Sequence, residues 1–408
     1  MVGAPWISLC LALGASPPPH PAKFARAWST RGVYTGRTDM PPLEEVASRC
    51  GVDPPLHAPR WVWTVAWRAG KRALPLLHRW DACAATDTNV NLVVCWLKAI
   101  AGNRPRGGCP DGGIAYDLLP PVTRRLVSAP VARFYPKLHH QNVALRTAFL
   151  DAAVERELAQ SITSDGADSR PSQIVRAVVL GAGFDVRALR LSSQSARAAV
   201  WSEVDLAHVS KQKQAMLSRL GRRRPALLAR LTALTQISGN LSRPGDVAFA
   251  LRTAFGAARA DKGTGTATAE PAKPAEELTA QVVAAGAAVR PTPGATVARR
   301  TPLAPEMHAL VVIEALMIYL PAEAATALLR ACVAEAEAAG AARLTICFSD
   351  RLPCGKSCSY EDAAAALATA DPRLHLDEHS WLPKPGLARH QGVARAQLYC
   401  CSETVPSA

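Results

Sequence analysis

The chain has 408 residues, of which 49% are hydrophobic, so it can bury the core of one large domain or of two average ones. Its 47 Lys and Arg against 33 Asp and Glu give a formal net charge of +14, which is typical of proteins with anionic partners. No apolar run reaches the roughly 18 residues of a membrane-spanning helix, so no membrane association is expected. The basic residues are scattered apart from one cluster at Gly221 to Pro225, and we therefore expect no nucleic-acid partner.

Residues 1–80 form an N-terminal extension that is rich in Pro, Trp and Arg and has little hydrophobic periodicity. Its apolar start and the acid-free stretch that follows are compatible with an organellar targeting segment or with a partly disordered arm, and we favour the second interpretation. We expect a cytoplasmic protein, because the eleven cysteines contain no C-x-x-C pair and predict reduced thiols.

One group of cysteines and histidines is a candidate zinc site. Cys354 and Cys358 precede His375 and His379 in the order of a zinc finger. The gap between the two pairs is longer than the usual dozen residues or so and contains no aromatic core, so we expect no metal site.

Residues 81–160 are predicted to be a helical region that serves as a lid and contributes to the substrate site. A first helix is expected from about Thr86 to Ile100, and a Gly/Pro loop is expected over residues 101–113. A second helix is expected from Asn142 to Gln160, since apolar residues recur there at helical spacing, with Arg146 close to its start.

Residues 161–408 are predicted to form an α/β domain with a doubly wound, mostly parallel sheet, because strand and helix patterns alternate. Residues 256–304, dominated by Ala, Gly, Thr, Pro and Lys, are interpreted as a low-complexity insertion. The expected strands include 177–180, 199–205, 234–237, 309–320, 344–348 and 394–400, and the expected helices include 206–220 and 322–339.

A glycine loop, Gly181-Ala182-Gly183, follows the first of these strands at the edge where an open α/β sheet binds its ligand. Glycine lets the chain turn sharply and lets a ligand approach the backbone closely. Val186 stands where a dinucleotide-binding G-x-G-x-x-G motif has its third glycine. This departure disfavours a pyrophosphate ligand and suits S-adenosylmethionine (SAM), which has no phosphate.

Three polar residues at strand ends are candidates for ligand binding. Asp205 follows Gly181 by 24 residues, where nucleoside-binding folds place an acid for the ribose hydroxyls; the alternative is a helix cap. Glu314 interrupts an apolar run, and a buried acid is costly unless it is paired or functional, so we expect it at the site or paired with an arginine. Asn240 ends the intervening strand and is either an adenine contact or a turn residue.

In order and spacing, these pieces resemble the leucine carboxyl methyltransferase family over roughly residues 82 to 350. The resemblance implies a class I SAM-dependent methyltransferase with a Rossmann-like fold. The best-known members methylate the C-terminal leucine carboxylate of the protein phosphatase 2A catalytic subunit. The acidic tail of that subunit would then be the partner of this basic chain. We expect this chain to be a monomer. The matching segments are 136–146, Gln173 to Leu191, Glu203 to Asp205, Gly239 to Leu241 and Ile313 to Leu320.

The resemblance also implies a role for each position. Arg146 would bind the SAM carboxylate, and Glu314 would face the SAM amino group and methyl region. As a separate hypothesis on catalysis, we expect Arg146, Tyr319 or a lid residue to orient the accepting carboxylate. The remaining cofactor contacts would be Gly181, Ala182 and Gly183 at the methionine part, Asp205 at the ribose, and Asn240 with Leu241 at the adenine.

Two departures from the family pattern keep alternatives open. Asn240 replaces the acid that is usual in the family, and Leu92 to Val94 occupy the places where the family carries a lysine, with Lys98 the nearest candidate. The alternatives are a small-molecule or wybutosine-type tRNA carboxyl methyltransferase, and a non-catalytic module that binds SAM or the phosphatase.

Overall fold

A computed structural model describes nine segments of the chain, and all of them belong to one compact unit that comprises residues 1–257 and 305–408. The expected extension, 1–80, and residues 257–304 of the expected insertion lie outside the described segments. These segments are 86–102, 109–128, 137–163, 173–191, 199–228, 234–256, 306–354, 359–384 and 389–398.

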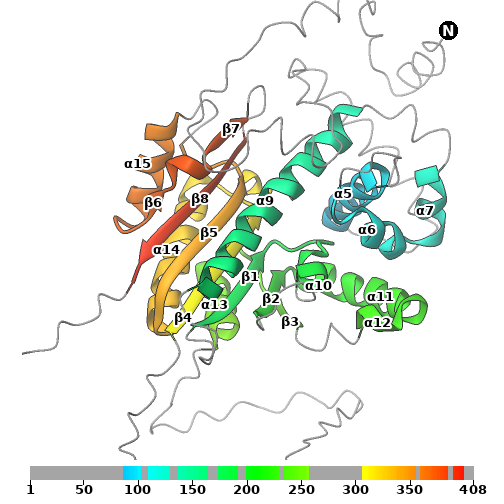
Figure 1. Ribbon diagram of the computed structural model, residues 1–408, viewed down its shortest axis with the longest axis horizontal. Helices are drawn as coiled ribbons and strands as arrows, with labels where there is room; N and C mark the ends of the chain where they lie inside the picture. Colours follow the sequence, from blue (N-terminus) through cyan, green and yellow to red (C-terminus); the bar gives the residue numbers. More distant parts are fainter. Residues whose placement is uncertain are drawn as a thin grey trace, which may run out of the picture. The chain divides into compact units, whose positions relative to one another are not determined.

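The centre of this unit is an eight-stranded, mostly parallel sheet in the order β3-β2-β1-β4-β5-β8-β6, and β7 also pairs with β8 (Figure 1). The first five strands in this order are parallel, whereas β8 is antiparallel to β5. The predicted doubly wound, mostly parallel and Rossmann-like sheet is thereby confirmed. The strands are β1 (Gln173–Leu180), β2 (Val200–Asp205), β3 (Leu234–Ser238), β4 (Glu306–Glu314), β5 (Ala341–Asp350), β6 (His375–Leu376), β7 (Leu382–Lys384) and β8 (Arg389–Gln397).

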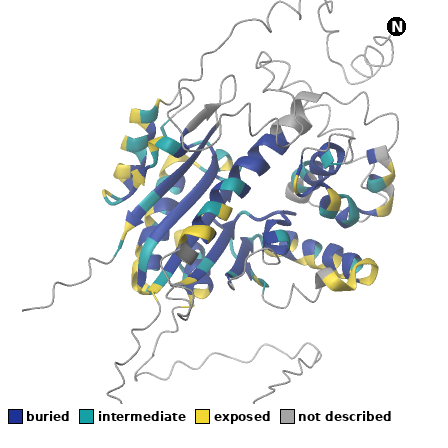
Figure 2. Ribbon diagram, viewed as in Figure 1, coloured by how far each residue is buried: buried dark blue, intermediate teal, exposed yellow. Residues whose placement is uncertain are grey.

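Helices cover both faces of the sheet, which explains why its central strands are apolar along their whole length. In β1, Val178 and Leu180 pack toward α13 and α14, whereas Ala177 and Val179 pack toward α9. The burial colours of Figure 2 show β1, β4, β5 and the sheet-facing side of α9 as largely buried. The helices of these two layers are α9 (Lys137–Thr163) and α10 (Arg187–Leu191) on one face, and α13 (Pro244–Phe255), α14 (Ala322–Ala338) and α15 (Tyr360–Ala370) on the other.

The two helices expected before the sheet are present as α5 and α9, although α9 begins earlier than expected, at Lys137. The expected Gly/Pro loop is shorter, because α6 begins at Gly112. A Cβ on Gly102 would lie 2.4 Å from the Cα of Gly112, so only glycine permits this approach of α5 and α6. These helices share a third apolar cluster with α11. The helices concerned are α5 (Thr86–Gly102), α6 (Gly112–Leu118), α7 (Pro121–Ser128), α11 (Ala207–Arg223) and α12 (Pro225–Leu228).

The strand expected at 309–320 is shorter at its end, since β4 stops at Glu314 and a 3-10 turn, η3 (Met317–Tyr319), follows. Cys354 is disulfide-bonded, which corrects the expectation of a reduced thiol there. In the described segments, no helix is long and apolar enough to cross a membrane. His, Cys, Asp and Glu side chains form no metal-holding group within these same segments.

Candidate functional site

The glycine loop lies at the carboxyl edge of the sheet, between β1 and α10. Gly181 and Gly183 have φ angles of 65° and 47°, a left-handed conformation that favours glycine. A Cβ on Gly183 would lie 2.7 Å from Oδ1 of Asn91 on α5, so the loop is also too tightly covered for a side chain. The backbone N–H groups of Gly181 and Ala182 donate to the Val204 carbonyl at 2.9 and 3.1 Å, which fixes the loop to the end of β2.

Asp205, at the end of β2, is hydrogen-bonded to this loop. Its carboxylate accepts hydrogen bonds from the backbone N–H of Gly183 at 2.6 Å and of Leu206 at 2.7 Å. Burial raises the pKa of Asp205, and the two backbone hydrogen bonds oppose that rise. The structure therefore brings together two parts of the predicted cofactor site, the glycine loop and the strand-end acid.

Glu314, at the end of β4, is surrounded by cations. Its Oε1 lies 2.5 Å from Nε of Arg146, and its Oε2 lies 2.9 Å from Nη2 of Arg187 and 3.8 Å from Nζ of Lys98. Burial alone would raise the pKa of Glu314, but Lys98, Arg146 and Arg187 outweigh it and hold this pKa well below its usual range. Glu314 is thus a carboxylate at neutral pH. Its contacts are compatible with both predictions made from the sequence, an acid of the ligand site and an acid paired with an arginine.

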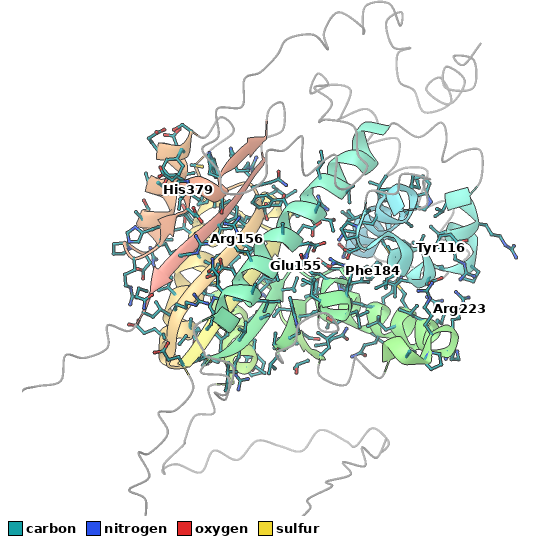
Figure 3. All side chains as sticks on the ribbon, in the orientation of Figure 1. Tyr116, Glu155, Arg156, Phe184, Arg223 and His379 are labelled. Atoms are coloured by element: carbon teal, nitrogen blue, oxygen red, sulfur yellow. The ribbon has the colours of Figure 1, made fainter. Side chains whose placement is uncertain are left out.

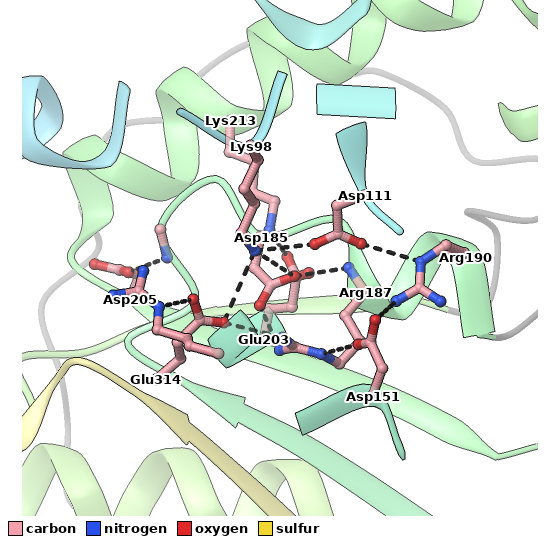
Figure 4. A network of polar contacts seen from close by, with 12 residues as sticks. Lys98, Asp111, Asp151, Asp185, Arg187, Arg190, Glu203, Asp205, Lys213 and Glu314 are labelled. Carbon is pink, nitrogen blue, oxygen red and sulfur yellow. Dashed lines mark hydrogen bonds and ion pairs between the residues drawn. The ribbon is translucent and has the colours of Figure 1, made fainter. Parts of the chain in front are cut away.

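These residues belong to a larger cluster, which we call the ion network (Figure 4). Arg187, fully buried, pairs with Asp185 at 2.6 Å and with Asp151 at 2.7 Å. Arg190 pairs with Asp151 and, at 3.0 Å, with Asp111, which in turn lies 2.9 Å from Lys98. The four cations and four carboxylates balance, as buried charges require. The ion network consists of Lys98, Asp111, Arg146, Asp151, Asp185, Arg187, Arg190 and Glu314.

The charges of the ion network shift one another's proton affinities. Burial opposes the charge on Lys98, but Asp185, Glu314 and Asp111 together raise its pKa. For Asp111 burial is outweighed by Lys98 and Arg190, so its pKa falls to about 2. Burial raises the pKa of Asp151, and the neighbouring guanidinium groups of Arg187 and Arg190 oppose that rise.

The residues predicted for the adenine lie in the loop between β3 and α13. Asn240 Oδ1 accepts from the backbone N–H and the hydroxyl of Ser242 at 3.0 and 2.7 Å, so its side chain shapes the loop as a turn residue does. Leu241 is buried in the core. The loop adjoins Asp205, because Gly239 N donates to the Asp205 carbonyl at 2.9 Å.

Tyr319 stands apart from the ion network. Its side chain is 57% exposed, and no described interaction joins it to Arg146 or Glu314. The turn that carries Tyr319 is nevertheless tightly held, because the buried carboxylate of Asp350 accepts from the backbone N–H groups of Leu316, Met317 and Ile318 at 2.5, 2.7 and 3.0 Å. Ala315, which links this turn to β4, has a φ of 56°, a strained conformation for alanine.

Sequence reasoning missed most of the ion network. Asp185 and Arg187 lie inside the matched segment Gln173 to Leu191, and their place in it was the available signal. Asp151 lies on the predicted helix that also carries Arg146. Lys98 was only the nearest candidate for a missing lysine, and the structure places it beside Glu314. Asp111 carried no sequence signal, because only its contacts with Lys98 of α5 and Arg190 of α10 reveal its role.

Comparison with known proteins gives one family match. Residues 119–333, more than half of the chain, match the family model described as leucine carboxyl methyltransferase. This range contains all of the predicted cofactor-binding residues and Tyr319. No curated protein matches the chain.

Several solved structures resemble the fold at low similarity. Magnesium protoporphyrin IX methyltransferase from Synechocystis PCC 6803 with bound SAH is 10% identical, with 62% of this chain and 84% of that chain covered and a TM-score of 0.30. An O-methyltransferase family 2 protein from Planctomyces limnophilus DSM 3776 in complex with apigenin is 12% identical, with 76% and 81% covered and a TM-score of 0.27. The complex of LepI with SAM is 12% identical, with 96% and 86% covered and a TM-score of 0.30.

Proposed function

This chain belongs to the leucine carboxyl methyltransferase family, a family of SAM-dependent methyltransferases, and on that premise we propose that it methylates the C-terminal leucine carboxylate of the protein phosphatase 2A catalytic subunit. The family match supports the reaction class. The choice of acceptor is a proposal drawn from the best-known members of the family.

One observation supports the cofactor site most strongly, namely the side-by-side placement of Arg146 and Glu314. The methionine end of SAM is a zwitterion, with a carboxylate and an ammonium group on one carbon. A guanidinium and a carboxylate held 2.5 Å apart offer the complementary pair of charges. We propose that Arg146 binds the carboxylate of SAM and that Glu314 binds its amino group.

The rest of the cofactor fits along the edge from β4 to β3. Gly181, Ala182 and Gly183 offer a backbone surface without large side chains for the methionine part. Asp205 uses one hydrogen bond per carboxylate oxygen on the backbone, so each oxygen retains acceptor capacity for a ribose hydroxyl. The loop of Asn240 and Leu241 is the place for the adenine.

When bound, SAM supplies an electrophilic methyl group: a carboxylate oxygen of the acceptor forms the new O–C bond while the C–S bond breaks and the sulfur keeps the electron pair. The protein needs no general base, because a C-terminal carboxylate is already ionised at neutral pH. The chain's task is to hold the acceptor in line and to keep water out. The buried ion network keeps Arg146 and Glu314 in fixed positions for that purpose.

The acceptor would approach from the side of the exposed Tyr319. We propose that Arg146 and Tyr319 orient the accepting carboxylate and that residues 81–160 act as a lid over it. A net charge of +14 favours encounter with an acidic peptide tail, since complementary charges raise association rates. A cytoplasmic location is part of the same proposal.

Incubation of the purified protein with methyl-labelled SAM tests this function. Parallel reactions contain phosphatase 2A core enzyme, unmodified tRNA, or no acceptor, and base-labile label on the phosphatase is the expected result. Label on the tRNA would replace the proposed acceptor with the wybutosine-type alternative. Failure to bind SAM in calorimetry would leave only a non-catalytic binding module.

A further inference from the structure

One buried carboxylate, that of Asp350 at the end of β5, holds a whole turn of the backbone. Its Oδ2 accepts hydrogen bonds from the N–H groups of Leu316 and Met317 at 2.5 and 2.7 Å. Its Oδ1 accepts from the N–H groups of Ile318 and Arg351 at 3.0 and 2.7 Å. Three of these donors are consecutive in the chain, and successive N–H groups that converge on one point form an anion site. The chain's own carboxylate occupies this one.

The turn, which we call the β4 turn and which comprises residues 315–318, begins in a conformation that alanine disfavours. The φ of Ala315 is 56°, where Cβ crowds a backbone carbonyl oxygen. The N–H of Ala315 donates to the Ser349 carbonyl at 3.1 Å, so its start is also tied to β5. A strained residue persists only where its surroundings fix it. The carboxylate of Asp350 is the contact that the next three N–H groups share, so it fixes the strained turn.

The β4 turn lies against the glycine loop. A Cβ on Gly181 would lie 3.0 Å from Cδ1 and 3.2 Å from Cβ of Leu316, so the Leu316 side chain covers the Cα of Gly181. Leu316 is half-buried, and it therefore lines the loop while part of the residue stays accessible. The conformation of the turn thus decides what lies beside the methionine part of the predicted cofactor site.

The β4 turn also directly follows Glu314, the last residue of β4. In the proposed function, Glu314 binds the amino group of SAM. A relaxed Ala315 would change the path of the chain at the next residue and would move Leu316 relative to both Glu314 and Gly181. The left-handed conformation of Ala315 therefore sets the spacing of two parts of the cofactor site.

We propose that Asp350 is a positioning residue of the cofactor site, which holds the β4 turn so that Leu316 stays over Gly181; the inference rests on the proposed function. Asp350 acts through the turn and not by touching the cofactor, because it is fully buried and each of its oxygens accepts two backbone hydrogen bonds. A carboxylate suits this role, since both of its oxygens accept, whereas an amide has only one accepting atom.

The first test is Asp350→Asn in the full chain. This variant keeps the size of the side chain but turns an NH2 group toward two backbone N–H donors. We expect calorimetry to show roughly tenfold weaker binding of S-adenosylhomocysteine, together with a lower melting temperature. The matched control is Glu157→Gln on α9, since Glu157 is a buried carboxylate that accepts from Thr345 and Arg395 at 3.0 and 2.7 Å. The control should also melt earlier but keep wild-type affinity.

The second test leaves Asp350 in place and changes only Ala315. Ala315→Asn and Ala315→Val add side chains of similar size, but asparagine tolerates a left-handed backbone and β-branched valine does not. We expect Ala315→Asn to bind S-adenosylhomocysteine like the wild type and Ala315→Val to bind it roughly tenfold more weakly. Glycine adopts this backbone without strain. Ala315→Gly should therefore recover part of the affinity that Asp350→Asn loses.

Four results would each overturn the inference. These are wild-type affinity in Asp350→Asn, an equal loss of affinity in Glu157→Gln, equal affinities of Ala315→Asn and Ala315→Val, and no recovery by Ala315→Gly. The proposed function fails in a distinguishable way. A wild type that does not bind S-adenosylhomocysteine removes the cofactor site and this inference together. If phosphatase 2A stays unlabelled while the affinities change as expected, the inference stands and only the acceptor changes.

Discussion

Two buried polar clusters lie at opposite ends of β4, and α9 contributes to both. The ion network is at the carboxyl end. The second cluster, which we call the histidine network, starts at His308 near the amino end, where His308 Nε2 lies 3.0 Å from Thr345 Oγ1 and the Thr345 hydroxyl donates to Glu157 Oε2 at 3.0 Å. Glu157 belongs to α9, as Arg146 and Asp151 of the ion network do.

The histidine network consists of His308, Thr345, Glu157, Arg343, Arg395, Asp377, Ser380 and Arg156. Arg343 donates to Nδ1 of His308 at 3.2 Å, so His308 is neutral and donates from Nε2. Burial, with Arg343 and Arg395 adding to it, lowers the pKa of His308 to about 3. Arg156, which Figure 3 labels on α9, donates to Ser380 Oγ at 3.2 Å.

The two clusters differ in the charge of their members and in their proposed part in ligand binding. The histidine network combines a neutral imidazole with the ion pairs that Arg395 forms with Glu157 and Asp377, and it ties α9 to β5 and β8. Every member of the ion network is an acid or a base, and in the proposed function its Arg146–Glu314 pair binds the zwitterionic end of SAM. In that proposal the ligand-binding contacts are those at the carboxyl ends of the strands.

The largest expected effect comes from removing one charge of the ion network. Glu314→Gln leaves Arg146, Arg187 and Lys98 without their shared carboxylate, and breaking a buried ion pair costs about 3–5 kcal/mol. Urea unfolding should show a loss of this size, and SAM binding should disappear. Glu323→Gln, in the exposed first turn of α14, is the control and should unfold like the wild type; equal stability of both variants would contradict the role given to Glu314.

The histidine network predicts a dependence of stability on pH. The pKa of His308 is about 3 in the folded chain and 6.5 when unfolded, so below pH 6.5 the unfolded chain binds the extra proton. The contribution is complete above pH 6.5 and is lost as the pH falls toward 3. Between pH 7 and 5 the unfolding free energy should drop by about 2 kcal/mol from this residue. His308→Gln should remove that part of the slope, and an unchanged slope would show that His308 is not the titrating group.

A third prediction compares two arginines of α9. Arg146→Ala should weaken SAM binding by roughly tenfold or more, about 1.4 kcal/mol, because a charge-assisted contact is lost. Arg156→Ala, on the same helix but in the histidine network, should leave SAM affinity unchanged. Asp205→Ala should resemble Arg146→Ala. Calorimetric titration measures all three, and wild-type affinity in the Arg146 or Asp205 variant would remove that residue from the cofactor site.

The smallest effect is expected where charges meet on the surface. Arg373 forms ion pairs with Glu337 at 2.8 Å and with Asp371 at 3.0 Å, but its side chain is 38% exposed. Arg373→Ala should therefore cost less than about 1 kcal/mol in urea unfolding. A loss comparable to that of Glu314→Gln would contradict the idea that burial separates the two kinds of ion pair.

The sheet was predictable because each central strand is one short apolar run that ends in a glycine or an acid. Gly181, Asp205 and Glu314 were identified for that reason, and the structure joins Asp205 to the glycine loop through the Gly183 N–H and places Glu314 at the same edge. The partners of Glu314 were harder to find, because Arg146 is 168 positions away and reaches it only when α9 packs on the sheet. The exposure of Tyr319 and the turn role of Asn240 depend on local backbone geometry that spacing alone does not encode.

Because α9 contributes to both networks, it covers the sheet and also fixes the distance between the two sets of contacts. Arg146 and Glu157 are eleven residues apart, which is about 16 Å along a helix, and both must meet fixed partners on β4 and β5. A substitution between them changes one contact, but an inserted or deleted residue turns one end by about 100° relative to the other. This part of the chain should therefore tolerate a change of side chain at its exposed position, Glu155, while rejecting any change of length.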